Sequence, residues 1–282
     1  DYEDYFTSKL KLFEQTETAI VNLNSKDLDR ILDEANKSKK IITFGTDKKA
    51  SVYGYNIRKD GINTIFNVRT EKFDNEFILT MPGLFNVENA LAAIAVTNDM
   101  GIPVKHIYNG IKNARVSGRM EVYSTKDNDV IVIVDYAHNK LSFEELYKST
   151  IKEYPGRKII TVFGCPGNHA INRRKDLGLL AGKYSTMNYL TIEDPRYEEV
   201  RDICLDIARY IEKKHGKYEI IVDRGEAIRK AIFDNSHGSI ILITGKGNET
   251  VQYIKGKYVE TLTDVDYVKQ TINELDNLKV NV

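Results

Sequence analysis

Two kinds of segment alternate in the second half of the chain: runs of apolar residues, and segments in which apolar residues recur at helical spacing. Apolar runs such as 130–134 and 240–243 are typical of strands covered on both faces, as in a parallel sheet. Segments with helical spacing separate most of the strands. We predict strands near 119–124, 130–135, 158–164, 188–192, 217–222 and 239–244, and helices near 140–152, 173–185, 198–214 and 224–235. This alternation predicts an α/β fold with a doubly wound, Rossmann-like sheet, followed by a hairpin around Gly256 and a last helix from Asp264.

The first half follows a different pattern. It predicts a helix at 2–15, strands at 19–23 and 41–45, and three exposed, antiparallel strands near 51–58, 62–70 and 76–81. Ser25 is the predicted N-cap of a helix to about Asn36. A further helix is entered through Pro82 and Gly83, and another follows Pro103. We therefore predict two closely packed domains, 1–117 and 118–282.

Composition narrows the class of protein. Hydrophobic residues make up 41% and charged residues 29% of the 282 residues, as in soluble globular proteins. Lys plus Arg and Asp plus Glu both number 41, so no basic field indicates nucleic acid. No stretch predicts a membrane span or a signal peptide. With only two cysteines, a disulfide framework is not expected, and a cytoplasmic location is.

Polar residues follow the ends of several predicted strands. The run VIVIV ends in Asp135, Tyr136 and His138, and other strands run into CPGNH at 165–169, EDPR at 193–196 and GKGNE at 245–249. One such end is ordinary turn chemistry, but parallel strands bring four ends to one edge. We therefore predict a ligand site there. Its carboxylates and Arg196 suit a zwitterionic amino acid, and would equally suit an internal salt bridge.

Three neighbouring features leave alternatives open. Gly164 and Gly167 are able to bring backbone N–H groups close to an anion, yet no G-x-G-x-x-G supports a dinucleotide site. The basic run at 173–175 suits either an anion or a solvated helix face. Cys165 has no adjacent base and is interpreted as structural.

The motifs SGRMEVY, VDYAHN, VFGCPGNH, EDPR and GKGNE follow one another in an order that resembles the Mur ligases, especially the MurE type. YEDYFTSKLKLF and PGLFNVENALAAIA extend the resemblance over essentially the whole chain. The resemblance implies the last part of a central ATPase domain followed by the C-terminal domain.

The resemblance also implies a reaction. ATP phosphorylates a carboxylate of UDP-MurNAc-L-Ala-D-Glu to an acyl phosphate, the amine of a diamino acid attacks it, and phosphate leaves. The implied cofactors are ATP and Mg²⁺. The Mg²⁺ ion, together with cationic side chains, neutralises the anionic reactants. The implied partners are these small molecules, with no nucleic acid and no membrane.

Family positions carry over to this sequence as follows. Lys9 matches a lysine that becomes a metal-holding carbamate, and without the resemblance it would be interpreted as an exposed helical lysine. With His138, Lys9 is assigned to catalysis. The ATP-binding positions are Asn86, Asn89, Arg119, Asp135 and His138. The positions that recognise the added amino acid are His169, Asp194, Arg196, Gly245 and Glu249.

The sequence departs from the family in informative places. Glu193-Asp194 stands for the usual Asp-Asn, Asn248 for a histidine, and His169 for an arginine that contacts the diamino acid. Arg196 favours diaminopimelate or a lanthionine-like ligand, and lysine stays possible. The phosphate-binding motif G-T-x-G-K-T does not occur in the 282 residues. We expect a C-terminal fragment that lacks the UDP-binding domain and is inactive alone.

Two alternatives stay open at this point. One is a Mur-like amide ligase outside the cell wall, of the cyanophycin or folylpolyglutamate type. The other is a non-catalytic module that binds a nucleotide and an amino acid.

Overall fold

The computed structural model describes residues 2–60, 63–81, 83 and 85–280, with the side chain of residue 280 excepted. The chain divides into two compact units, Asp1–Arg115 and Val116–Val282, and each is described by itself. The sequence placed the boundary two residues later. None of the helices in the described ranges is long and apolar enough to cross a membrane.

The first unit is a five-stranded sheet in the order β1-β2-β3-β4-β5. Its strands are β1 (Thr18–Asn22), β2 (Lys40–Gly45), β3 (Val52–Asp60), β4 (Asn63–Arg69) and β5 (Asp74–Leu79). The first three are parallel, and β4 is antiparallel to both of its neighbours, as the alternation predicted. The expectation that all three of these strands are exposed was wrong for β4, because it lies between β3 and β5 and is mostly buried.

The helices of this unit are α1 (Tyr2–Leu10), the 3₁₀ turn η1 (Lys11–Gln15), α2 (Leu28–Ala35), α3 (Asn86–Asp99) and α4 (Val104–Asn113). The predicted cap at Ser25 was wrong, because the chain turns there and α2 begins after Asp27, whose φ is +53°. α3 begins at Asn86, and Pro82 lies outside the described residues. Val87, Leu91 and Ile94 of α3 pack on Phe66 and Phe77 of the sheet.

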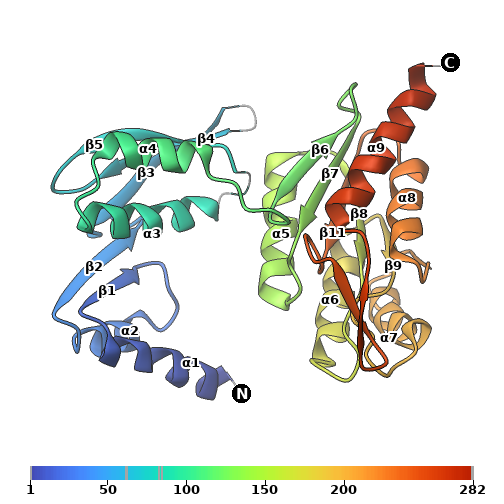
Figure 1. Ribbon diagram of the computed structural model, residues 1–282, viewed down its shortest axis with the longest axis horizontal. Coiled ribbons are helices and arrows are strands. Elements are labelled where there is room, and N and C mark those ends of the chain that lie inside the picture. Colours follow the sequence, from blue (N-terminus) through green and yellow to red (C-terminus); the bar gives the residue numbers. More distant parts are fainter. Residues whose placement is uncertain (1, 61–62, 82, 84, 281–282) are drawn as a thin grey trace. The chain divides into compact units, whose positions relative to one another are not determined.

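The second unit is a six-stranded sheet in the order β10-β9-β8-β11-β7-β6 (Figure 1). Its strands are β6 (Glu121–Ser124), β7 (Val130–Asp135), β8 (Lys158–Phe163), β9 (Met187–Leu190), β10 (Tyr218–Ile220) and β11 (Ser239–Thr244). All pairings are parallel except that of β6 with β7. β6 is antiparallel because only a short link, 125–129, separates it from β7, too short for a crossover.

Helices cover both faces of this sheet, which confirms the predicted α/β, doubly wound fold (Figure 1). One face carries α5 (Lys140–Glu153), α6 (Asn172–Tyr184) and α7 (Val200–Glu212), and the other α8 (Arg224–Asp234) and α9 (Asp264–Val280). Every residue of β11 is buried, as its apolar run predicted. The hairpin of β12 (Val251–Ile254) and β13 (Lys257–Glu260) turns at Gly256.

Candidate functional site

The carboxyl ends of β7, β8, β9 and β11 meet at one edge of the second sheet. β11 pairs with β7 up to Thr244 opposite Asp135, and β8 pairs with β9 up to Phe163 opposite Leu190. The segments after these ends are 136–139, 164–171, 191–197 and 245–249. The fold thus brings together the four polar strand ends that the sequence indicated, where parallel α/β sheets bind their ligands.

Tyr136 is the centre of one group at this edge. Its hydroxyl donates to Glu249 Oε1 at 2.6 Å, and the Arg119 guanidinium lies 4.4 Å from its ring centroid. His138 meets the ring edge-on at 4.9 Å. The hydrogen bond to Glu249, with burial second, raises the pKa of Tyr136 to about 12, so the phenol stays a donor. Three predicted site residues therefore surround Tyr136, which the sequence placed at this strand end without giving it a role.

His138 and Asp135 are both fixed by the backbone. His138 Nδ1 lies 2.8 Å from the Tyr136 carbonyl oxygen, an acceptor, so Nδ1 is the donor in this contact and Nε2 is left for a ligand. Asp135 accepts the N–H groups of Met120 and Ala137 at 2.9 and 2.7 Å. Burial raises the pKa of Asp135, and these N–H groups oppose the shift. The carboxylate therefore holds the 118–120 segment, with lone pairs left over.

A second group links the ends of β9 and β11 through a buried lysine. Lys246 is 3% exposed, and its ammonium contacts Asp194 Oδ1 at 2.9 Å and Glu249 Oε2 at 2.5 Å. Because Glu249 also accepts from Tyr136, one chain of contacts runs from Asp194 to Arg119. Two predicted amino-acid-binding residues and one predicted ATP-binding residue thus belong to a single network.

Glu193 stands out at this edge because it is buried without a partner. It is 8% exposed, and no hydrogen bond or ion pair of its carboxylate is found within the described part of the chain. Burial raises its pKa to about 7, although Arg224 and Lys246 favour the ionised form. Gly245 has φ +104°, a conformation that favours glycine, and a Cβ there would lie 2.4 Å from Glu193 Oε2. The carboxylate therefore has acceptor capacity for hydrogen bonds from a cationic ligand.

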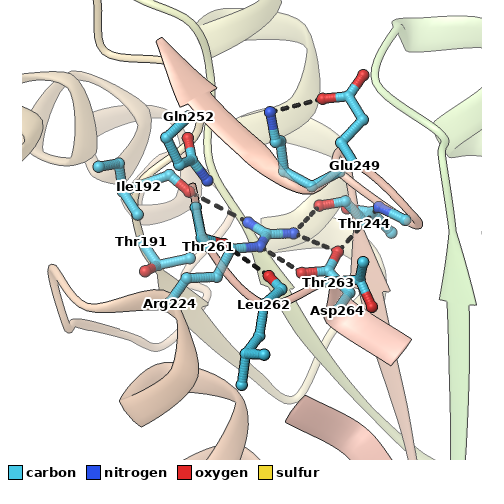
Figure 2. Close-up of polar contacts among 12 residues, drawn as sticks. Thr191, Ile192, Arg224, Thr244, Glu249, Gln252, Thr261, Leu262, Thr263 and Asp264 are labelled. Carbon is cyan, nitrogen blue, oxygen red and sulfur yellow. Dashed lines mark hydrogen bonds and ion pairs between the residues drawn. The ribbon is translucent and has the colours of Figure 1, made fainter. Parts of the chain in front are cut away.

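A buried ion pair forms the floor of the site (Figure 2). Arg224 donates to Asp264 at 2.6 and 2.8 Å, and to the carbonyl oxygens of Ile192 at 3.2 Å and Thr244 at 2.8 Å. Asp264 in turn accepts the Gly247 N–H at 3.0 Å. One guanidinium therefore connects the ends of β9 and β11 to the starts of α8 and α9. Such a pair fixes geometry more than it adds stability.

Arg196 and His169 differ in how they are held. The Arg196 guanidinium lies 5.4 Å from the Tyr253 ring centroid, and its Nε is buried without a hydrogen-bond partner. His169 is exposed, and no hydrogen bond or ion pair of it is found in the described ranges. The backbone of Arg196 is held by Tyr253 and Lys255, whereas no contact of the His169 ring is found among the described residues.

The open alternatives near β8 resolve toward structural roles. The Gly167 N–H donates to the Asp194 carbonyl oxygen, and a Cβ at Gly167 would lie 1.9 Å from the Pro195 oxygen. That glycine therefore permits close packing of two loops. Arg174 is buried and pairs with Glu198 at 2.9 Å, so the basic run is not simply a solvated face. Cys165 is buried, and burial raises the pKa of its thiol well above the ordinary value.

The remaining predicted residues lie in the first unit. Lys9 is exposed on α1, with its ammonium 5.4 Å from the Tyr5 ring centroid. Asn86 and Asn89 lie in the first turn of α3, where the Asn89 amide donates to Asn86 Oδ1 at 2.9 Å. The described residues include no group of three or more His, Cys, Asp or Glu side chains able to hold a metal ion.

Several contributors were given no individual role by sequence reasoning, although three of them, Tyr136, Glu193 and Lys246, lie in the motifs that it quoted. They are Tyr136, Glu193, Lys246, Arg224, Asp264, Gln252 and Tyr253. Tyr136, Glu193 and Lys246 directly follow buried strands and were open to the same argument as their neighbours. Arg224, Asp264 and the two hairpin residues carry no local signal, because their partners are 17 or more residues away.

Comparison with known proteins agrees with this architecture. Residues 1–97 match the profile of the Mur ligase middle domain, and residues 118–247 match that of the Mur ligase glutamate ligase domain. A solved structure of UDP-N-acetylmuramoyl-L-alanyl-D-glutamate–2,6-diaminopimelate ligase superposes with a TM-score of 0.61 at 26% identity, over 98% of this chain and 57% of that one.

Two curated relatives show the range of amino acids in the family. The 2,6-diaminopimelate ligase of Clostridioides difficile is 34% identical over 98% of this chain and 57% of its own length. The L-lysine ligase of Streptococcus thermophilus is 32% identical over 95% of this chain and 54% of its own length. The chain thus spans little more than half the length of these relatives. It belongs to the Mur ligase family, because it matches that family's middle-domain and glutamate-ligase-domain profiles.

Proposed function

We propose that this chain works in an ATP-dependent amide ligase of cell-wall precursor synthesis. The ligase would add a diamino acid to UDP-N-acetylmuramoyl-L-alanyl-D-glutamate. ATP would phosphorylate the glutamate carboxylate, the amine would attack the acyl phosphate, and phosphate would leave. The observation that carries the proposal is the carboxyl edge of the second sheet, where the Glu193 carboxylate has no ion pair within the described residues and Arg196 Nε has no hydrogen-bond partner there. The names of the relatives supply the reaction.

The charges at this edge support a diamino acid as the ligand. Carboxylates of Glu193, Asp194 and Glu249 suit ammonium groups, and the planar Arg196 guanidinium suits a carboxylate. Lysine has one carboxylate, whereas diaminopimelate and lanthionine have two. The unpaired Arg196 therefore favours one of the latter two as the substrate.

The residues proposed for ATP divide between the two units. Asn86 and Asn89 offer amide groups of the kind that recognise adenine, and His138 offers a free Nε2. Asp135 keeps acceptor capacity for ribose hydroxyls, because each carboxylate oxygen has a second lone pair. Arg119 supplies a cation for phosphates.

Magnesium is proposed only as the partner of the ATP phosphates. The described residues include no metal-binding cluster, so no catalytic step is assigned to a protein-held ion. Lys9 would contribute only as a carbamate, whose formation is open to mass spectrometry. The reaction is expected in the cytoplasm, because both cysteines are buried and unpaired.

Calorimetric titration of the 282-residue chain with meso-diaminopimelate, lanthionine and lysine tests the amino-acid site. We expect one diamino acid to bind, and Arg196→Ala to weaken that binding by roughly tenfold or more, since it removes a charge-assisted pair. Arg201→Ala removes an exposed arginine of α7 and serves as the matched control.

Phosphate release tests the reaction itself. It is measured with the chain alone and with the chain joined to the N-terminal part of the C. difficile relative, in the presence of ATP, Mg²⁺ and the UDP-dipeptide. Release that depends on the bound diamino acid supports the proposal. Absence of binding by all three amino acids, or release supported equally by a peptide acceptor without UDP-MurNAc, would contradict it.

A further inference from the structure

The β12–β13 hairpin has contacts that its own folding does not require. Its two strands pair only with each other among the described strands, apart from a single bridge between Ile254 and Arg196. β13 is exposed along its whole length. β12 instead faces the segment 194–196, which the proposed function places at the amino-acid site.

Four hydrogen bonds join β12 and its turn to this segment. The Asp194 N–H donates to Gln252 Oε1 at 2.7 Å, and the Tyr253 N–H donates to Asp194 Oδ1 at 2.9 Å. The Arg196 N–H donates to the Tyr253 carbonyl oxygen at 2.9 Å, and the Lys255 N–H to the Arg196 oxygen at 2.6 Å. Gln252 is 4% exposed, so its side chain has no competing water. The hairpin therefore fixes both the backbone and the carboxylate of this segment.

The segment needs such support because of its backbone. Asp194 has φ +40° and Arg196 has φ +54°, in the left-handed region that residues with a Cβ adopt only under constraint. Pro195 stands between them and restricts the conformations of its neighbour. Without the hairpin, the two functional side chains would be free to leave these orientations.

Tyr253 also positions the Arg196 side chain. The guanidinium lies 5.4 Å from the Tyr253 ring centroid, within the range of a cation–π contact. No ion pair of Arg196 is found in the described ranges, and its buried Nε has no partner. The ring thus holds a planar cation whose N–H groups stay available to an anion, and a carboxylate matches this geometry.

We propose that the β12–β13 hairpin is a specificity element of the amino-acid site. Gln252 sets the conformation of 194–196, and Tyr253 aims Arg196 so that the site prefers an amino acid with a second carboxylate. This inference rests on the proposed function, and it adds two positioning residues that do not themselves need to touch the substrate.

The test compares the affinities of the 282-residue chain for meso-diaminopimelate and for lysine. The wild-type chain is expected to prefer meso-diaminopimelate. Tyr253→Leu removes the ring and is expected to reduce that preference by about tenfold, within the strength of cation–π contacts. Tyr253→Phe keeps the ring and is expected to stay within about twofold of wild type.

Gln252→Leu gives an independent readout. It leaves the buried Asp194 N–H without an acceptor and is expected to weaken both ligands by roughly tenfold, without changing their ratio. Circular dichroism melting curves check that each variant is folded.

The possible failures are distinguishable. A wild-type chain that binds neither amino acid contradicts the proposed function and this inference together. A chain that binds, but either prefers lysine or keeps its full preference in Tyr253→Leu, overturns the specificity role alone. Equal loss of preference in Tyr253→Phe would also overturn it, because the ring would then not be the cause.

Discussion

The carboxyl edges of the two sheets differ in whether their polar side chains have hydrogen-bond partners. In the first unit, Glu88 accepts from the amides of Asn22 and Asn24 at 2.9 and 2.8 Å, and Asn24 also donates to Thr46 at 3.1 Å. In the second unit, Glu193 is a buried residue whose carboxylate has no hydrogen bond or ion pair among the described residues, and Nε of Arg196 is buried without a hydrogen-bond partner there. Because buried polar groups are nearly always hydrogen-bonded, the open edge is where a ligand is expected.

The largest expected effect comes from removing the floor of the open edge. Arg224→Met leaves Asp264, which is 1% exposed, as a buried charge without its partner. We expect the free energy of unfolding to fall by about 3–5 kcal/mol, measured by urea denaturation. Arg229→Met, on the same helix, breaks an exposed pair with Glu274 and should change it by less than about 1 kcal/mol. Similar losses in both variants would mean that Arg224 does not support this edge.

The next effect concerns the pH dependence of the open edge. Burial raises the pKa of Glu193 from 4.5 to about 7. Between these values the unfolded chain binds fewer protons than the folded chain, so stability falls as pH rises and stays lower above pH 7. Glu193→Gln should remove this fall and stabilise the protein at pH 8 by up to about 3 kcal/mol.

Thermal unfolding between pH 4 and 8 measures this effect. Glu226→Gln, at an exposed position of α8, controls for the loss of one negative charge. An unchanged pH profile in Glu193→Gln would contradict this, because it would show that the pKa of Glu193 is the same in the folded and the unfolded chain.

The smallest effect is expected at the closed edge. Glu88→Ala removes an acceptor shared by two amides that are partly accessible to water, so we expect a loss of about 1 kcal/mol in stability. A double-mutant cycle with Asn24→Ala should give a coupling energy of roughly 0.5–1 kcal/mol. No effect on amino-acid binding by the second unit is expected. A loss of binding in Glu88→Ala would break the contrast between the two edges.

Local sequence patterns were sufficient for most secondary-structure elements and for the position of the site. The apolar run at 130–134 predicted a strand buried on both faces, and β7 lies between β11 and β6 as such a strand should. Asp135, Asp194 and Glu249 were found because each lies at or just after the end of a strand, and parallel strands end at one edge. The roles assigned to these residues stay predictions.

Patterns failed where two conformations were locally acceptable. Ser25 was a reasonable cap by residue type, yet the turn at 25–27 moved the start of α2 to Leu28. The residue types of Asp194 and Arg196 did not predict their left-handed backbone. Asp is tolerated in that region but does not require it, and Arg is not favoured there. Both conformations depend on neighbours that are distant in sequence.

The sequence by itself determined the order of strands and helices, because apolar periodicity is set by each segment and its burial. Only the tertiary structure decided which polar groups have partners. Arg224 meets Asp264 across 40 residues, and Gln252 meets Asp194 across 58. Likewise, Lys246 pairs with Asp194 and Glu249, whereas no ion pair of Glu193 is found among the described residues. Hydrogen bonds require atoms to meet within about 3 Å, and distances of that kind are fixed only when the whole sheet has formed.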